Sequence, residues 1–234
     1  MRKHLQMNCG VPKGITSRAI LGKLMKANGW FMGPLYLVVF IGMAGCAEYS
    51  ERTLPILGEP QVDPLTGETT PFIGPDFSFL NQDNEWITQE HVEGKIQVVD
   101  FFFASCVTIC PIMTRSMVKV QEAFPEDPRL ALLSYTIDPA HDTPERLAEY
   151  ADRYGIDNQQ WSLLTGKGEE VFSVSKGYKV MAFDDSLGET PNLIHDGTFV
   201  LLDTQRRVRG YYNGLEPTEI DRLIDDIELL LTTL

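Results

Sequence analysis

A strand that runs directly into a pair of cysteines constrains the fold of this chain more than any other feature. The stretch "IQVVDFFFA", residues 96–104, is rich in apolar, aromatic and β-branched side chains, which is typical of a strand buried on both faces. Cys106 and Cys110 follow it, with Pro111 directly after the second cysteine. Apolar residues then recur at helical spacing from Met113 onward. The sequence therefore predicts a buried strand, a loop that carries both cysteines, and a helix.

From Thr70 onward, strands and helices alternate, and an antiparallel hairpin and a final helix follow. The helix predicted over 142–155 has clear ends, because Thr143 precedes Pro144 at its start and Gly155 closes it. This order of elements predicts an α/β fold, a three-layer sandwich with a central mixed sheet. The other predicted elements are strands over 130–138, 161–166, 197–203 and 208–214 and helices over 168–178 and 216–231.

The two cysteines are expected at the carboxyl end of a central strand. Open α/β sheets place their functional sites at this edge, and the N-terminus of the following helix can stabilise a thiolate. The succession of buried strand, cysteine loop and helix is similar to that of the thioredoxin-type fold. The fold class expected for the folded part of the chain is therefore thioredoxin-like.

The N-terminal segment has the pattern of an export signal. Residues 1–45 contain six basic and no acidic residues, and 30–45 is an apolar run of 16 residues without a charge. A membrane-spanning helix needs roughly 20 apolar residues, so this run is short. It ends in Ala44, Gly45 and Cys46, which resemble the end of a bacterial lipoprotein signal. Cys46 is therefore the predicted lipid attachment site, and the alternative is an uncleaved membrane anchor.

Three segments are predicted along the chain. Residues 1–46 form the signal or membrane-anchor segment, 47–69 a flexible tether, and 70–234 the thioredoxin-like domain. The tether is polar and rich in proline and glycine, with a short hairpin expected around "PLTGET". Both interpretations of the N-terminal segment place the domain in the cell envelope, anchored to the membrane and facing the periplasm or another extracytoplasmic side.

The exported part of the chain is strongly acidic. The whole sequence has 20 Lys and Arg and 33 Asp and Glu residues; six of the basic residues precede Cys46, which leaves 14 basic and 33 acidic residues and a formal net charge of −19. Such a surface repels the phosphate backbone of nucleic acids. No nucleic-acid partner is therefore expected.

Only two cysteines remain for chemistry in the exported domain, since Cys9 lies in the leader and Cys46 is the predicted lipid site. A disulfide between Cys106 and Cys110 would close a loop of only about five residues, which restricts the unfolded chain little. A purely structural disulfide is therefore disfavoured. Two functional interpretations stay open: a redox-active dithiol, or a pair of soft thiolate ligands for a metal such as Cu(I) or Zn.

A metal bound by two thiolates from one loop needs a further ligand, and a histidine is the expected one. His195 directly precedes the apolar strand predicted over 197–203. In a thioredoxin-type layout, the loop before that strand lies beside the cysteine loop. The other histidines are weaker choices: His4 lies in the leader, His91 is expected to be exposed to solvent, and His141 lies in a loop before a helix. A structural role for His195 is the alternative to ligation.

Three stretches together resemble the Sco/SenC family of copper-handling, membrane-tethered, thioredoxin-fold proteins. They are "DFFFASCVTICPIMT", "YTIDPAHDTPERLAEYADRYG" with "WSLLTG" after it, and "HDGTFVLLD" with "VRGYYNG". The resemblance covers roughly residues 70–231. It implies that Cys106, Cys110 and His195 bind Cu(I) or Cu(II). Asp138 matches the "TIDP" block of the family and is expected to shape its loop.

The resemblance implies a metallochaperone more than an enzyme. It implies delivery of copper to the dinuclear copper centre of cytochrome c oxidase, so the expected partner is the subunit that holds this centre or another exported copper protein. The alternative is a thiol:disulfide oxidoreductase that reduces the cysteines of an exported partner. That activity would need Cys106 and Cys110 but not His195.

The chain departs from the family pattern at both parts of the predicted site. The family often has proline and an acidic residue after the first cysteine, where this chain has Val107 and Thr108. A more apolar loop is expected to raise the thiol pKa values. The family commonly has aspartate before the histidine, where this chain has Ile194 before it and Asp196 after it. The hydrogen-bond partner of the imidazole is therefore not predicted by the sequence.

Overall fold

The computed structural model describes residues 52–184 and 193–233. The predicted signal segment with Cys46, and the first residues of the predicted tether, lie outside the described residues. All described residues belong to one compact unit, Ser50–Leu234. A chain of residues 47–234 therefore contains this whole unit with its core.

In the described part of the chain, no helix combines the length and the apolar character needed to cross a membrane.

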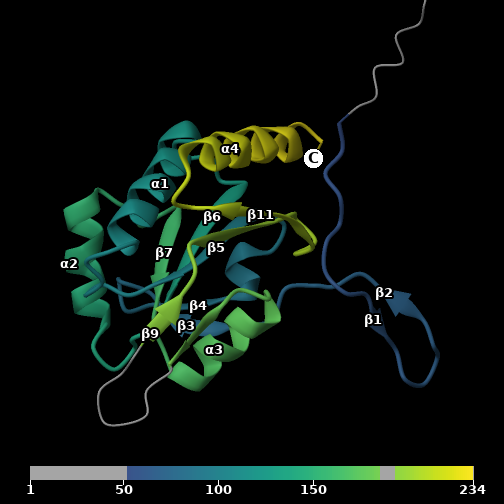
Figure 1. Cartoon of the computed structure of the whole chain (residues 1–234), viewed down its shortest axis with the longest axis horizontal. Helices are drawn as coiled ribbons and strands as arrows, with labels where there is room; N and C mark the ends of the chain where they lie inside the picture. The colour runs from purple at the N-terminus through teal and green to yellow at the C-terminus, as the bar shows by residue number, and fades with distance from the viewer. Residues whose placement is uncertain (1–51, 185–192, 234) are drawn as a thin grey trace, which may run out of the picture. The chain divides into compact units, whose positions relative to one another are not determined.

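A five-stranded mixed sheet forms the centre of the fold, in the order β11-β10-β5-β6-β7 (Figure 1). The middle strand β5 pairs in parallel with β6 and antiparallel with β10, so the predicted mixed sheet is confirmed. The hairpin of β10 and β11 is also confirmed. The strands are β5 (Ile96–Phe102), β6 (Leu130–Thr136), β7 (Trp161–Leu164), β10 (Thr198–Leu202) and β11 (Val208–Asn213).

The sheet is covered on both faces, which gives the predicted three layers. Every residue of β5 and β6 is buried, and neighbouring residues of a strand face opposite sides. Val98 lies in the core beneath α1, α2 and α4, whereas Val99 lies in the core beneath α3 (Figure 1). The helices are α1 (Cys110–Ala123), α2 (Pro144–Tyr154), α3 (Gly168–Gly177) and α4 (Pro217–Thr232).

The ends of α2 lie at the capping residues that the sequence indicates. Thr143 accepts a hydrogen bond from the main-chain N–H of Arg146 at 3.4 Å, and Pro144 is the first residue of α2. Gly155 ends this helix in the left-handed conformation, with φ of 68°, which glycine adopts without strain. The predicted boundaries of this helix are therefore confirmed.

Three short two-stranded ribbons surround the main sheet. The hairpin expected around "PLTGET" is confirmed as β1 (Gln61–Val62) paired with β2 (Thr69–Thr70). The other two ribbons are not predicted by the sequence, because their strands have only three residues each. They are β3 (Ser78–Leu80) with β4 (Trp86–Thr88), followed by the short helix η1 (Gln89–Val92), and β8 (Ala182–Asp184) with β9 (Leu193–His195).

The chain before the first ribbon packs against the edge of the main sheet. The main-chain N–H of Leu57 donates to the Val208 carbonyl at 2.8 Å, and Arg209 donates to the Pro55 carbonyl at 3.0 Å. Arg52 forms an ion pair with the buried Asp226 of α4. These contacts attach residues 52–57 to β11 and α4.

Leu132 tests the position of the core, because it is fully buried in the middle of β6. We expect L132A to lower the free energy of unfolding by about 2–5 kcal/mol, since the cavity left in the core relaxes only partially. Urea denaturation of residues 47–234 measures this loss. Leu65 is 93% exposed, so L65A should change stability by less than about 0.5 kcal/mol. Equal losses in the two variants would contradict the described core.

Candidate metal centre

Three side chains that are distant in the sequence meet at one end of the sheet. Cys106 lies in the loop after β5, Cys110 is the first residue of α1, and His195 is the last residue of β9. Their ligand atoms all lie within 4.8 Å of one another. The Cys110 sulfur is 3.2 Å from His195 Nε2. The structure thus brings together the three residues that the sequence analysis selected, and their binding of a metal stays a prediction.

The cysteine loop is held by main-chain hydrogen bonds at the end of β5. The N–H of Ala104 donates to Asp142 Oδ2 at 2.9 Å, and the N–H of Cys106 donates to the Phe103 carbonyl at 3.2 Å. The helix begins at Cys110 itself. The three residues between the cysteines therefore span the change from loop to helix, and they leave Cys106 in the loop while Cys110 is fixed in the helix.

His195 reaches the cysteines because of the register of the sheet. Val200 of β10 lies opposite Val99 of β5 in antiparallel pairing, so the chain that enters β10 lies beside the chain that leaves β5. This confirms the expectation that the segment before this strand neighbours the cysteine loop. The segment is itself a strand, β9, in which His195 pairs with Ala182 of β8.

The imidazole of His195 is oriented by a main-chain carbonyl. Its Nδ1 is 3.0 Å from the carbonyl oxygen of Asp196, which only accepts hydrogen bonds, so Nδ1 carries the proton. Nε2, which faces the sulfurs, is then free to act as a metal ligand. The carboxylate of Asp196 instead accepts the main-chain N–H of Thr198 at 3.0 Å. The residue after the histidine thus orients the ring through its backbone.

Burial keeps the imidazole neutral over a wider range of pH. Desolvation lowers the pKa of His195 below its usual value, and the Asp196 carbonyl and carboxylate offset only part of this effect. A neutral imidazole is the form that binds metals. The site is therefore prepared for ligation without the loss of a proton from this ring.

The two thiols have opposite pKa shifts. Burial raises the pKa of Cys110 well above its usual value. Partial burial would also raise the pKa of Cys106, but hydrogen bonds from Thr108 and Cys110 outweigh it and lower the pKa. The Thr108 hydroxyl lies 3.5 Å from the Cys106 sulfur. The expectation that this loop raises both thiol pKa values therefore holds for Cys110 and is wrong for Cys106, because Thr108 supplies a hydroxyl group.

The loop after β6 supports the site without joining it. The carbonyl of Asp138 accepts the main-chain N–H groups of His141 and Asp142 at 3.1 and 2.9 Å, in agreement with a loop-shaping role. His141 is exposed, and its Nδ1 lies 2.7 Å from Asp138 Oδ1. His91 is also exposed, as expected, and bonds to Thr88. Neither histidine belongs to the group with the two cysteines.

Asp142 and Phe103 both hold the cysteine loop, and neither was predicted from the sequence. Asp142 is fully buried, and its Oδ2 accepts hydrogen bonds from Ala104 N–H and from the Thr136 hydroxyl at 2.5 Å. Its place in the "DPAHDTP" block was a usable signal for Asp142. Phe103 looked like one more aromatic residue of a buried strand, so no signal distinguished it.

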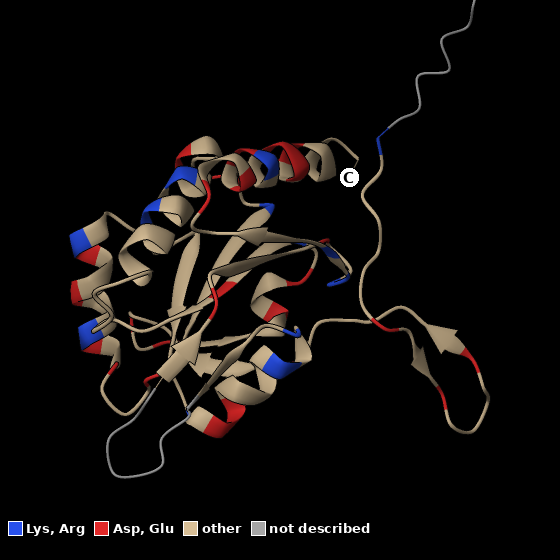
Figure 2. Ribbon diagram, viewed as in Figure 1, with Lys and Arg blue, Asp and Glu red and all other residues tan. Residues whose placement is uncertain are grey.

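Among the described residues, acidic side chains lie on α2, α3 and α4 and in several loops (Figure 2). The group of Cys106, Cys110 and His195 contains no carboxylate. Asp100 lies beneath it in β5, fully buried and hydrogen-bonded by Ser134, and burial raises its pKa to about 7. The site is therefore defined by sulfur and nitrogen donors, which hard cations such as Ca²⁺ and Mg²⁺ do not prefer.

Two thiolates and one imidazole fit two kinds of chemistry. They are soft and borderline ligands of the kind that Cu(I) and Zn select, and three protein ligands leave a position open for exchange. The same two thiols can also exchange with disulfides, because a thiolate is the attacking species. The neutral, oriented imidazole favours the first use, since disulfide exchange does not require it.

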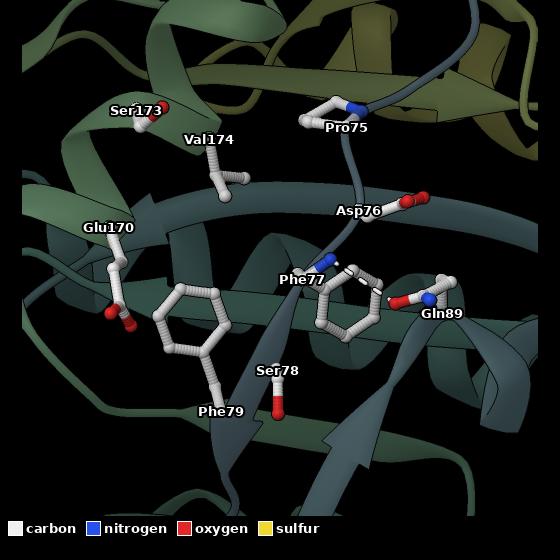
Figure 3. Close-up of a pocket in the computed structure, with 9 residues that line it drawn as sticks. All are labelled: Pro75, Asp76, Phe77, Ser78, Phe79, Gln89, Glu170, Ser173 and Val174. Atoms are coloured by element: carbon white, nitrogen blue, oxygen red, sulfur yellow. Dashed lines mark hydrogen bonds between the residues drawn. The ribbon is translucent and has the colours of Figure 1, made fainter.

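A pocket elsewhere in the domain has no such donors. It lies between β3 and α3, where the rings of Phe77 and Phe79 and the side chains of Val174 and Glu170 line it (Figure 3). The main-chain N–H of Phe77 donates to Gln89 Oε1 at 3.3 Å beside it. None of its lining residues is a cysteine or a histidine.

Comparison with protein families and individual relatives points to one group of proteins. The sequence model of the SCO1/SenC family matches residues 66–232. The SCO1 protein homolog of Bacillus subtilis is 33% identical over 175 residues, which cover 73% of this chain and 86% of that protein. A protein of Stutzerimonas stutzeri that is named as a copper-binding candidate is 27% identical over 153 residues, or 64% of this chain and 72% of that protein.

Solved structures of proteins from the same family also match this chain. The crystal structure of a SCO1/SenC family lipoprotein from Bacillus anthracis matches with a TM-score of 0.63 and 29% identity, over 75% of this chain and 99% of that chain. BsSco is described as a member of the Sco family of cytochrome c oxidase assembly proteins that has a disulfide switch. Its structure matches with a TM-score of 0.60 and 30% identity, over 70% of this chain and 95% of that chain.

The difference between the two thiols predicts selective alkylation. We expect iodoacetamide to modify Cys106 before Cys110 in the reduced chain of residues 47–234, because Cys106 is partly exposed and its lowered pKa leaves more thiolate at neutral pH. Mass spectrometry of peptides after short reaction times measures the order. The C106S variant is the control and should react slowly. Faster labelling of Cys110 would contradict the described burial.

Proposed function

This chain belongs to the SCO1/SenC family, and we propose that it is a copper-binding assembly factor for cytochrome c oxidase with Cys106, Cys110 and His195 as its copper ligands. The observation that carries this proposal is the meeting of two sulfurs and one imidazole nitrogen within 4.8 Å. Two relatives support it: BsSco is described as a cytochrome c oxidase assembly protein, and the Stutzerimonas protein is named for copper binding.

Copper is the cargo of this activity, and delivery follows from ligand exchange. The acceptor is the subunit that holds the dinuclear copper centre of the oxidase, or another exported copper protein. Cys110 and His195 are buried, whereas Cys106 is partly exposed. An incoming thiolate of the acceptor, itself a soft ligand for Cu(I), can therefore approach the metal from the side of Cys106 and replace the protein's ligands one at a time.

The proposed location is the outer side of a membrane. Residues 1–46 act as an export segment with Cys46 as the lipid attachment site, or as an uncleaved anchor. Residues 47–69 connect this segment to the folded domain, and residues 70–234 form the domain that carries the proposed copper site. A relative from Bacillus anthracis is described as a lipoprotein, which supports the lipid-anchored form. The domain then faces the periplasm or another extracytoplasmic side, where exported copper proteins are assembled.

A second function is favoured by the opposite pKa shifts of the two thiols. In a thiol:disulfide oxidoreductase, the Cys106 thiolate attacks a disulfide of the exported partner and releases one of its sulfurs as a thiol. Cys110 then loses its proton and attacks the mixed disulfide. The partner leaves as a dithiol, and the chain keeps a Cys106–Cys110 disulfide. The disulfide switch described for BsSco supports this second function.

Titration with Cu(I) separates the two functions. The reduced chain of residues 47–234 is titrated under anaerobic conditions against a chromophoric chelator, beside H195A and H141A. We expect one Cu(I) per chain and a loss of affinity of at least tenfold in H195A, about 1.4 kcal/mol, because one of three ligands is removed. H141A removes an exposed histidine outside the ligand group and should bind like the wild type.

Weak binding by the wild type, or the same affinity in H195A, would contradict the copper proposal. Disulfide exchange is measured on the same variants with a small disulfide substrate. Two results together would identify the chain as a reductase. H195A would keep its disulfide-exchange activity, and copper binding would not depend on His195.

A further inference from the structure

We infer that Phe103 positions His195 against the two cysteines and so determines how strongly the third ligand contributes to metal binding. This inference rests on the proposed function and names a residue beyond the ligand set. The ring of Phe103 meets the imidazole of His195 edge to face, with centroids 5.8 Å apart and planes at 80°. Aromatic rings attract each other in this geometry.

Phe103 also holds the cysteine loop through its main chain. Its carbonyl accepts the N–H of Cys106 at 3.2 Å. One residue therefore contacts two members of the ligand group, Cys106 by its backbone and His195 by its ring. A shift of Phe103 would change the separation between the sulfurs and the imidazole.

Hydrogen bonds on both sides of Phe103 hold its backbone in place, so its ring can hold the imidazole of His195 in a fixed position relative to the cysteine loop. The carbonyl before it, on Phe102, accepts the N–H of Ile137 at 2.8 Å, and the N–H after it, on Ala104, donates to the buried Asp142. The side chain packs against both hydrophobic cores, on the two faces of the sheet. Its position is thus set by the central sheet.

His195 needs this contact because β9, the strand that carries it, lies outside the main sheet. It belongs to the ribbon of β8 and β9, a two-stranded sheet of its own. The hydrogen bond from Nδ1 goes to the adjacent residue, Asp196, so it orients the ring relative to the ribbon and not relative to the sulfurs. The contact with Phe103 connects the ring to the element that carries the cysteines. Holding a ligand in place before binding strengthens binding.

Two substitutions at this position and one control test the inference. F103L removes the aromatic edge and keeps an apolar side chain and the main-chain bonds, whereas F103Y keeps the ring. F101L is the matched control, because Phe101 lies two residues earlier in the same strand, is buried, and stacks on Tyr135 at 5.5 Å instead. Urea denaturation of each variant measures its stability separately from its affinity.

Anaerobic Cu(I) titration against a chromophoric chelator gives the first readout. We expect F103L to bind Cu(I) about three- to tenfold more weakly than the wild type, F103Y to bind like the wild type, and F101L to lose stability without losing affinity. In the H195A background, F103L should cause no further loss, since a positioning residue has no effect without the group it positions.

A metal-free readout comes from the NMR signals of the imidazole. In the reduced protein without copper, the ring protons of His195 should shift in F103L and keep their wild-type values in F101L, because the Phe103 ring lies against the imidazole. This measurement keeps its meaning if the wild type fails to bind copper, so failure of this inference and failure of the proposed function are distinguishable.

Two results would overturn the role of Phe103. One is an F103L loss of affinity that is equally large with and without His195, because Phe103 would then act through the cysteines or the fold. The other is a set of imidazole signals that F103L leaves unchanged, because the ring contact would then be absent in solution.

Discussion

The approach of His195 Nε2 to within 3.2 Å of the Cys110 sulfur is the contact on which the proposed site depends. The two residues are 85 positions apart in the sequence, and only the topology of the sheet brings them together. Because β10 runs antiparallel to β5, the chain entering one strand lies at the same edge as the chain leaving the other. The cysteine loop and the histidine ribbon therefore meet at the carboxyl end of the central strand, where α/β sheets place their sites.

Burial divides the ligand group into a fixed part and an accessible part. Cys110 and His195 are buried in the fold, and the neutral imidazole is oriented by the Asp196 carbonyl. Cys106 lies in a loop, is partly exposed and has a lowered pKa. A carrier has to hold its metal and also release it. Under the proposed function, Cys110 and His195 would retain the copper, and Cys106 would be the position at which a partner's ligand enters. The same difference between the two thiols is the reason that dithiol exchange is proposed as the second function.

The sequence predicted the parts of this arrangement that have a local signal. Long apolar runs indicated β5 and β6, and Thr143, Pro144 and Gly155 marked the ends of α2. Strands of three residues, such as β9, carry too few positions to display an alternating pattern, so the element that carries His195 was not predicted. The carbonyl that orients the imidazole could not be predicted either, because every residue has one. Phe103 differs from its aromatic neighbours only in the contact that the tertiary structure gives it.

X-ray absorption spectroscopy of the Cu(I)-loaded chain tests the central claim most directly, because it counts the ligand atoms around the metal. We expect one Cu(I) per chain with two sulfur neighbours and one nitrogen neighbour that has the scattering pattern of an imidazole. A metal surrounded by sulfur alone, without an imidazole, would contradict the convergence of Cys106, Cys110 and His195 on one ion.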